Sequence, residues 1–338
     1  MPKRVLIIGA GGFIGGFIAD EARRRGYDTW CAVRATTSRR YLTDPELHFV
    51  ELDYDSPEQL RSTLSTTLPE GEKWDYVVHN LGATKCTNFA DFNRINFGYL
   101  REVVNALRDT AMVPEGFLYM SSLSALGPGD EKDYTPYPER AIPSPNTRYG
   151  LSKIKAETFL QTLPDFPWIV LRPTGVYGPH EKDYMMMVHC IDRHVDFGVG
   201  FRKQLLTFIY VEDLARAVFD ALEHIPATLH HAYAISEPRA YTQTEFRRLV
   251  ARLLGRKFVI PVRLPLWATY ITSAVAEKVG VLRMKPSTLN RDKYLIMKQR
   301  NWSCDTEAAR RDFGFVAQVP LEEGLRRAIE SEADNGKV

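Results

Sequence analysis

The chain has 338 residues, with 44 Lys and Arg against 42 Asp and Glu, so its formal net charge is only +2. This length suits a large nucleotide-binding domain with a smaller lobe, and the balanced charge gives no electrostatic case for nucleic acid binding. The four cysteines lack CxxC spacing, so we expect no metal site, reduced thiols and a cytoplasmic protein.

Apolar runs and helical patterns alternate through the first half of the chain. The expected strands are residues 5–8, 29–33, 48–52, 76–79, 116–120 and 168–171. The expected helices are residues 13–25, 57–64, 92–111 and 147–163. This alternation predicts right-handed crossovers and an α/β fold, a Rossmann-type doubly wound parallel sheet.

The pattern loosens after the strand at 168–171, and the rest of the chain predicts a smaller C-terminal substrate lobe. A strand-like run at 207–211, followed by a helical pattern, indicates one return to the core. We therefore expect a nucleotide-binding domain and a substrate lobe with the following boundaries: 1–176 and 206–230 in the domain, 177–205 and 231–330 in the lobe.

Residues 264–276 form an uncharged stretch with several aromatic side chains. The stretch is too short to span a bilayer, so we expect no membrane span. A lid or core helix is the preferred interpretation, and binding at a membrane surface remains the alternative.

A glycine-rich turn follows the first expected strand. Gly9, Gly12 and Gly15 have the GxxGxxG spacing and open the first helix. Glycine permits the tight turn and lets the backbone approach a pyrophosphate, which then lies at the positive end of the helix. A strand–helix turn without a ligand is the weaker alternative, because both flanking elements are predicted. We expect a dinucleotide site here, with Phe13 and Ile14 beside it.

The next two strand ends concern the adenosine part of the dinucleotide. An NAD-binding protein commonly has a carboxylate at the end of the second strand, whereas this chain has Val33 and Arg34, followed by Arg39 and Arg40. Guanidinium forks pair with phosphate oxygens, so NADP(H) is the expected cofactor, with NAD(H) as the alternative. Arg34 as a plain surface cation is the competing interpretation. Asp53, after the third strand, is expected either to accept from the adenine amino group or to cap the following helix.

The sequence YGLSK at Tyr149 to Lys153 lies on an expected helix, after a serine pair at Ser121 and Ser122. Residues four apart share one helix face, so the Tyr149 hydroxyl and the Lys153 ammonium can converge. Tyrosine has an unperturbed pKa of about 10, but a nearby ammonium and an oxidised nicotinamide favour its phenolate, which suits proton transfer. An isolated YxxxK is a weak signal. After the glycine-rich turn and the serine pair, it predicts a hydride-transfer site.

Several motifs, in this order, resemble the extended short-chain dehydrogenase/reductase family, also called the NAD-dependent epimerase/dehydratase family. They are GAGGFIG at 9–15, Asp53, HNLGA at 79–83, Asn96, FLYMSS at 117–122, YGLSK at 149–153, LRPTGVYGP at 171–179 and FIYVEDLA at 208–215. The VRAT at 33–36 and the tail pattern of residues 302–320 are most similar to the branch of 3β-hydroxysteroid dehydrogenases and dihydroflavonol reductases. The resemblance covers almost the whole chain.

The resemblance implies roles for the catalytic candidates. Ser122 would donate a hydrogen bond to the substrate oxygen, Tyr149 would give or take the proton, and Lys153 would bind the cofactor ribose and tune Tyr149. Asn96 would hold a water on the proton path. Ser124 is the second choice for the serine role, with a helix cap or turn as its alternative.

The resemblance also extends to binding residues and assembly. Leu81 and Ala83 would flank the cofactor, and the backbone from Pro173 to Val176 would meet the nicotinamide carboxamide, although a proline also stiffens the chain. A homodimer would form through the helices that carry Asn96 and Tyr149. The polar candidates for substrate contact are Lys85, Ser124, Tyr177, His180 and Tyr184.

Two departures distinguish the chain from sugar-nucleotide enzymes of the family. Leu126 stands where those enzymes usually have a tyrosine, and Thr174-Gly175 stands where many have an asparagine. The leading hypothesis is therefore an NADP(H)-dependent oxidoreductase that interconverts a secondary alcohol and a ketone on a small, rather apolar substrate. Modest support comes from apolar residues of the smaller lobe, which are commonly core: Met185 to Met187, Phe197, Phe201, Trp267 and Tyr270.

Two alternatives remain. A sugar-nucleotide epimerase or dehydratase would keep its NAD(H) tightly bound and return the hydride to the same substrate. A binding protein that senses NADP(H) would have no need of the proton relay, so the presence of Ser122, Tyr149 and Lys153 argues against it.

Overall fold

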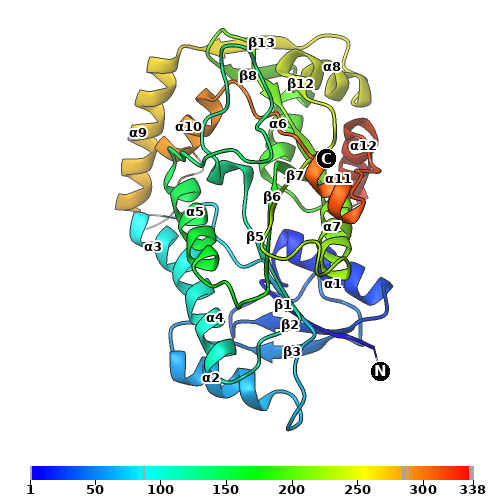
Figure 1. Ribbon diagram of the computed structural model, residues 1–338. Coiled ribbons are helices and arrows are strands. Elements are labelled where there is room, and N and C mark those ends of the chain that lie inside the picture. Colours follow the sequence, from blue (N-terminus) through cyan, green and yellow to red (C-terminus); the bar gives the residue numbers. More distant parts are fainter. Residues whose placement is uncertain (1, 87, 284–286, 288, 335–338) are drawn as a thin grey trace.

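A seven-stranded parallel sheet forms the centre of the molecule (Figure 1). The computed structural model describes residues 2–86, 88–283, 287 and 289–334. The strand order is β11-β6-β5-β4-β1-β2-β3, and every neighbouring pair is parallel. The strands are β1 (Arg4–Ile8), β2 (Asp28–Val33), β3 (His48–Glu51), β4 (Tyr76–His79), β5 (Gly116–Met120), β6 (Trp168–Pro173) and β11 (Ala232–Ile235). The predicted Rossmann-type doubly wound sheet is confirmed.

Helices cover both faces of the sheet, which explains why its strands are almost continuously apolar. One face packs against α1 (Phe13–Arg24), α7 (Val211–Glu223) and α11 (Glu307–Phe313). The other packs against α2 (Pro57–Thr66), α4 (Tyr99–Asp109) and α5 (Arg148–Gln161). The carboxyl ends of the parallel strands, where ligands bind in such sheets, lie beneath the smaller lobe (Figure 1).

The helix expected at 92–111 is divided in the structure. It consists of α3 (Phe89–Asn93), a π-helical turn (Arg94–Gly98) and α4. Such turns place one extra residue in the helix and are frequent at functional sites. Here the π-helical turn carries Asn96, which is fully buried.

The smaller lobe is built from short strand pairs and helices. The pairs are β7 (Gly175–Tyr177) with β10 (Phe208–Tyr210), β8 (Val195–Val199) with β13 (Ile260–Leu264), and β9 (Leu205–Leu206) with β12 (Tyr241–Thr242). The helices are α6 (Asp183–Asp192), α8 (Gln243–Leu253), α9 (Leu266–Leu282), α10 (Arg291–Lys298) and α12 (Leu321–Asp334). Its own core joins α6, α8 and α12 around Phe208.

The expected division of the chain into domain and lobe stays a prediction, and one element departs from it. Residues 232–235 were expected in the smaller lobe, yet they form β11, which pairs with β6 at the edge of the main sheet. The strand is only four residues long, and its place in the sheet depends on a partner far away in the sequence.

The stretch 264–276 forms most of α9, at the left of Figure 1. Many of its large apolar side chains are exposed, so the interpretation as a core helix is wrong. No helix within the described residues is both long enough and apolar enough to cross a membrane.

Candidate active site

The glycine-rich turn has the geometry that a dinucleotide requires. Gly9 has φ +87°, a conformation that favours glycine, and a Cβ atom there would lie 2.8 Å from the backbone nitrogen of Leu81. A Cβ atom at Gly15 would lie 2.7 Å from Cα of Ala10, so only glycine allows this close packing of helix and strand. Gly12 caps α1 without a side chain. The first N–H groups of α1 are thus free of a side-chain cap, as a pyrophosphate site requires.

The loop after β2 lies directly on this turn. A Cβ atom at Gly11 would collide with the Thr37 side chain, and the Thr37 hydroxyl accepts a hydrogen bond of 3.0 Å from the backbone N–H of Arg34. Arg34 is exposed. The Arg39 guanidinium lies 4.3 Å from the Phe49 ring centre, and that of Arg40 lies 4.3 Å from the ring centre of the adjacent Tyr41. The loop therefore gathers cations beside the dinucleotide turn.

Asp53 is exposed and does not cap the helix after β3. Its Oδ1 accepts a hydrogen bond of 3.0 Å from the backbone N–H of Asp55, two residues later. The N-cap of α2 is Ser56, whose hydroxyl accepts from Gln59. The alternative that Asp53 caps this helix is therefore wrong, and its contact with adenine stays a prediction.

The catalytic candidates meet where β5 ends and α5 begins. Ser122 follows β5 by two residues, and its hydroxyl forms a hydrogen bond with the Tyr149 phenol. The same hydroxyl oxygen accepts from the backbone N–H of Ser124 at 3.2 Å, which fixes its position. One helical turn after Tyr149, the buried Lys153 ammonium donates a 2.7 Å hydrogen bond to the carbonyl of Met120.

Burial shifts the pKa values of this pair in opposite directions. It raises the pKa of Tyr149 to about 12, and the hydrogen bond from Ser122 offsets only part of the rise. It lowers the pKa of Lys153 to about 7, although the Glu157 carboxylate acts in the other direction. The expected lowering of the Tyr149 pKa is therefore not a property of the protein alone, because removal of water from the phenolate outweighs the nearby ammonium.

The neighbouring serine has a structural role. The Ser121 hydroxyl donates a short hydrogen bond to Glu157 on α5. Glu157 also forms a buried ion pair with Arg172 of β6, with Nη2 2.5 Å from Oε2. Ser121 is therefore occupied, whereas Ser122 lies at the phenol.

Asn96 holds the loop that follows β4. Its amide oxygen accepts a 2.7 Å hydrogen bond from the backbone N–H of Ala83, and its amide nitrogen donates to the Ala83 carbonyl at 3.0 Å. The same nitrogen donates to the Ser152 hydroxyl at 2.8 Å. Asn96 thus joins the loop containing Leu81 and Ala83, expected beside the cofactor, to the catalytic helix. Its binding of a water stays a prediction.

The structure brings only some of the substrate candidates near the site. The Lys85 ammonium is 2.6 Å from an Asp183 carboxylate oxygen, at the start of α6. Tyr184 follows, and a Cβ atom on Gly175 would collide with its hydroxyl. Tyr184 therefore lies beside the β6–β7 connection, where Pro173 ends β6 and Val176 packs on the sheet core.

The candidates Tyr177 and His180 lie elsewhere. Tyr177 belongs to the core of the smaller lobe, where its ring packs on Phe208 and Tyr210, so the structure gives it no access to a substrate. The His180 ring stacks on Tyr41 at 4.2 Å and lies 6.3 Å from Phe17 of α1. His180 therefore lies on the side of the dinucleotide turn, and its role toward substrate stays a prediction.

One set of contacts at the start of α5 has no signal in the sequence. The Asp292 carboxylate of α10 accepts hydrogen bonds from the backbone N–H groups of Arg148 and Tyr149, the latter at 3.2 Å. Thr147 caps the next N–H, that of Gly150. Glu277 of α9 lies 3.1 Å from the Arg148 guanidinium and also binds Arg291 of α10. The smaller lobe thereby holds the end of the helix that carries Tyr149.

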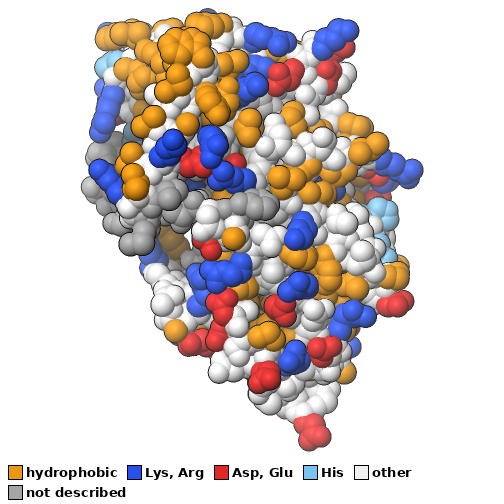
Figure 2. Space-filling model, turned by 90° about the vertical axis from the view of Figure 1, so that its left-hand side faces the viewer, with side chains coloured by type: hydrophobic (Ala, Val, Ile, Leu, Met, Phe, Trp, Pro, Cys, Tyr) orange, Lys and Arg blue, Asp and Glu red, His pale blue; other side chains and the backbone are white. Residues whose placement is uncertain are grey.

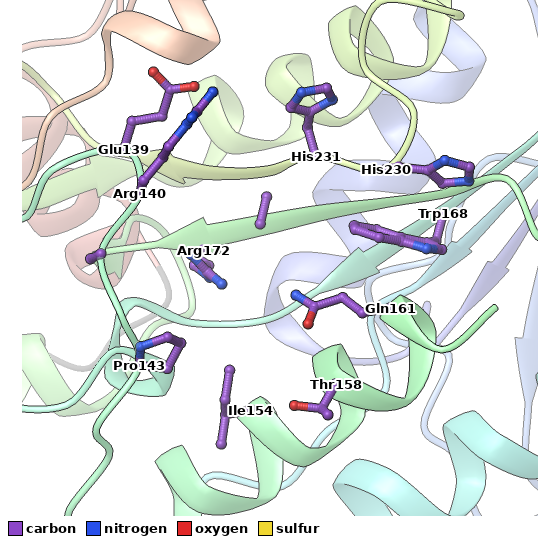
Figure 3. A pocket seen from close by; sticks show the side chains of 12 residues that line it. Glu139, Arg140, Pro143, Ile154, Thr158, Gln161, Trp168, Arg172, His230 and His231 are labelled. Carbon is purple, nitrogen blue, oxygen red and sulfur yellow. The ribbon is translucent and has the colours of Figure 1, made fainter. Parts of the chain in front are cut away.

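A separate pocket of about 540 Å³ lies on the other side of α5 (Figure 3). Thr158 and Gln161 line it from α5, Arg172 from β6, and His230 from the segment before β11. None of the four catalytic candidates lines it. The pocket is therefore distinct from the place where these candidates meet.

A family model described as the NAD dependent epimerase/dehydratase family matches residues 5–236. The chain belongs to this family, and it is an NAD(P)-dependent enzyme of the extended short-chain dehydrogenase/reductase type. The resemblance recognised in its motifs is confirmed.

Two curated relatives and one solved structure show the range of similar proteins. A 2-alkyl-3-oxoalkanoate reductase of Shewanella oneidensis is 26% identical over 359 residues, with 96% of this chain and 85% of that protein covered. A ceramide reductase of Caulobacter vibrioides is 24% identical over 301 residues, with 88% and 85% covered. The crystal structure of a UDP-glucose 4-epimerase from Thermotoga maritima has a TM-score of 0.76 at 20% identity, with 98% and 99% covered, and shares the fold.

We expect Lys153 to make stability depend on pH. Burial lowers its pKa from 10.5 to about 7, so between these values the unfolded chain holds a proton that the folded protein has lost. The free energy of unfolding of the cofactor-free protein should therefore rise with pH in this window, by up to ~1.4 kcal/mol per pH unit. Lys153→Met removes this contribution. Urea unfolding of both proteins measures the difference in free energy of unfolding, variant minus wild type. This difference should be most favourable to the variant below about pH 7 and should shrink toward about pH 10. A constant difference would contradict the assignment.

We expect Asp292 to position Tyr149. Asp292→Ala should lower the free energy of unfolding by about 0.5–2 kcal/mol, as for loss of a helix cap, and should lower kcat with less effect on the KM for the cofactor. Asp292→Asn keeps an acceptor oxygen, so it should retain most of the wild-type free energy of unfolding and most of the wild-type kcat. Steady-state kinetics and urea unfolding of the two variants measure this. A stability loss with unchanged kcat would show a purely structural role.

Proposed function

We propose that the protein is an NADP(H)-dependent oxidoreductase that interconverts a secondary alcohol and a ketone on a rather apolar substrate. The observation that carries the proposal is the hydrogen bond between Ser122 and Tyr149, with Lys153 buried one turn along the same helix. A protein that only sensed NADP(H) would not need this arrangement of hydroxyl, phenol and ammonium.

Each residue has a defined task in this proposal. Bound NADP(H) supplies hydride exchange between its nicotinamide ring and the substrate carbon. Ser122 holds the substrate oxygen, and Tyr149 donates a proton to that oxygen in ketone reduction or accepts it in alcohol oxidation. The Lys153 ammonium, 5.9 Å from the centre of the Tyr149 ring, would supply positive charge near the phenol. Asn96 keeps the 81–83 loop in place.

The preference for NADP(H) is supported by the loop after β2. Arg34, Arg39 and Arg40 gather in the loop whose Thr37 and Ser38 contact Gly11. The strand ends in Val33, so no carboxylate stands there to repel a 2′-phosphate. NAD(H) remains the alternative.

The apolar substrate is supported by the names of the two reductases, which refer to a 2-alkyl-3-oxoalkanoate and to a ceramide. Both names denote compounds that contain hydrocarbon groups. Leu126, which stands where sugar-nucleotide enzymes usually have a tyrosine, is buried beside Leu123 and Tyr137. This departure therefore supports an apolar substrate less strongly than the sequence alone suggested. Met185 is likewise buried in the core. Sugar-nucleotide epimerisation or dehydration therefore remains the second candidate, favoured by the fold shared with the Thermotoga maritima epimerase.

We further propose a cytoplasmic homodimer that pairs through α4 and α5. The four cysteines are free, as in a reducing compartment. The Phe97 ring, in the π-helical turn before α4, lies 6.0 Å from the Phe159 ring of α5, and both are partly exposed. Leu151 of α5 is exposed as well. Sedimentation at several protein concentrations measures the assembly, and cell fractionation measures the compartment.

We expect NADPH to bind more tightly than NADH. Arg34→Ala should weaken NADPH by about 1.5–3 kcal/mol, the value of a charge-assisted hydrogen bond, and leave NADH nearly unchanged. Arg108→Ala, which removes an exposed arginine of α4, is the matched control. Fluorescence titration with both cofactors decides. Equal binding of NADH and NADPH to wild type, or equal weakening of both by Arg34→Ala, would reject the assignment.

We expect NADPH oxidation with apolar ketones and none with UDP- or dTDP-sugars. Tyr149→Phe should abolish turnover and leave cofactor binding nearly intact, because only the proton-bearing hydroxyl is lost, whereas Lys153→Met should damage both. A spectrophotometric screen of long-chain, steroid-like and aromatic ketones, with sugar-nucleotide epimerisation assayed in parallel, tests the substrate class. Turnover of a sugar nucleotide without activity on any ketone would favour the second candidate, and normal turnover by Tyr149→Phe would remove the proton relay.

A further inference from the structure

An apolar stripe runs along the outer side of α9. Trp267, Ile271 and Val275 follow one another at intervals of four residues, and Val279 and Leu282 continue the stripe. Residues at this spacing lie on one side of a helix. All of them are exposed, Trp267 by 70% and Leu282 by 83%.

The stripe continues onto the neighbouring strands. Ile260 and Leu264 of β13 are exposed, and β13 pairs in parallel with β8, which carries the exposed Phe197. Figure 2 shows hydrophobic side chains gathered over the upper part of this side of the molecule. We call the following residues the apolar face: Phe197, Phe201, Phe258, Ile260, Leu264, Leu266, Trp267, Tyr270, Ile271, Val275, Val279 and Leu282. Exposed apolar patches of this kind mark sites of protein or membrane binding.

Basic residues predominate in the two segments that carry the apolar face. The segments 197–206 and 257–283 contain a single acidic residue, Glu277. Glu277 is occupied by Arg148 and Arg291, which hold its pKa down at about 2. The exposed cations of the same segments are Arg202, Lys203, Lys257, Lys278 and Arg283. This predominance of basic residues suits a partner that is apolar with negative charge around it.

This combination fits one occupant better than another. A second copy of the chain, joined by a two-fold axis, would bring the same cations together across the interface. An anionic bilayer offers hydrocarbon for the apolar side chains and negative headgroups for the cations, and Trp267 and Tyr270 are the residue types enriched at headgroup level. We propose that the apolar face docks on the surface of an anionic lipid bilayer, with α9 lying in the plane of the interface.

This docking would place the active site near the source of its substrate. The same helix that carries the apolar face holds Arg148, next to Tyr149, through Glu277. An apolar ketone or alcohol concentrates in a bilayer, and an enzyme seated there can take it directly. Only this statement about the substrate source rests on the proposed function; the docking itself does not. Vesicle binding is measured without cofactor or turnover, so failure of the docking and failure of the proposed function are distinguishable.

The test compares two valines of equal exposure. Val275 in the apolar face and Val316, which follows α11, are each 56% exposed, and Figure 1 shows α9 and α11 on opposite sides of the molecule. The full-length protein is sedimented with vesicles of phosphatidylcholine alone or with phosphatidylglycerol added. We expect binding to the anionic vesicles that weakens with salt, on the order of tenfold weaker binding for Val275→Asp, and no change for Val316→Asp.

Tryptophan fluorescence gives a second measurement of docking that needs no substitution at Val275. The Trp267 indole should enter the interface, so tryptophan emission should shift to shorter wavelength when anionic vesicles are added, and Trp267→Phe should lose most of that shift. Absence of binding to anionic vesicles would overturn the proposal. Equal binding to neutral vesicles, or equal loss in both valine variants, would also overturn it. A dimer that Val275→Asp dissociates, without vesicle binding, would assign the face to a second copy.

Discussion

The active site depends on the buried ion pair between Glu157 and Arg172. Removing two charges from water is costly, and the cost is recovered only with good geometry and further hydrogen bonds. Both are present, since the Arg172 guanidinium meets both Glu157 oxygens and the Ser121 hydroxyl donates to the same carboxylate. The pair joins α5 to the ends of β5 and β6, one turn beyond Lys153. The distance from the phenol of Tyr149 to the strand ends is therefore set by this interaction.

A second constraint acts at the other end of α5 and comes from the smaller lobe. The carboxylate of Asp292 occupies the positive end of the helix, a position that favours negative charge, and Glu277 secures the adjoining Arg148. The lobe that would bind the substrate thus also fixes Tyr149, the residue proposed to exchange a proton with it. A movement of α9 and α10 would be transmitted directly to the backbone of Tyr149.

Local patterns were sufficient to predict most strands of the sheet and to select the residues proposed for the site. The bounds of β4 and β5 agree with their apolar runs, because strands covered by helices on both faces must be apolar throughout. The glycine spacing and the YGLSK motif likewise report local geometry. What failed depends on distant partners. The strand β11 is short and defined by its pairing with β6, and Asp292 lies 143 positions from Tyr149 in the sequence. The exposure of the apolar side chains of α9 could not be predicted from the sequence either, because an apolar helix has the same composition in a core and at a docking surface.

The pKa values of Tyr149 and Lys153 bear on the direction of the proposed reaction. With its pKa raised to about 12, Tyr149 keeps its proton at neutral pH in the protein alone, which is the form needed to protonate a substrate oxygen. Alcohol oxidation requires the phenolate instead, and the protein's own burial opposes that form. The Lys153 ammonium gives limited help, because its own pKa is about 7. The neutral form of Tyr149 agrees with the proposed ketone reduction, in which this residue would donate its proton to the substrate oxygen.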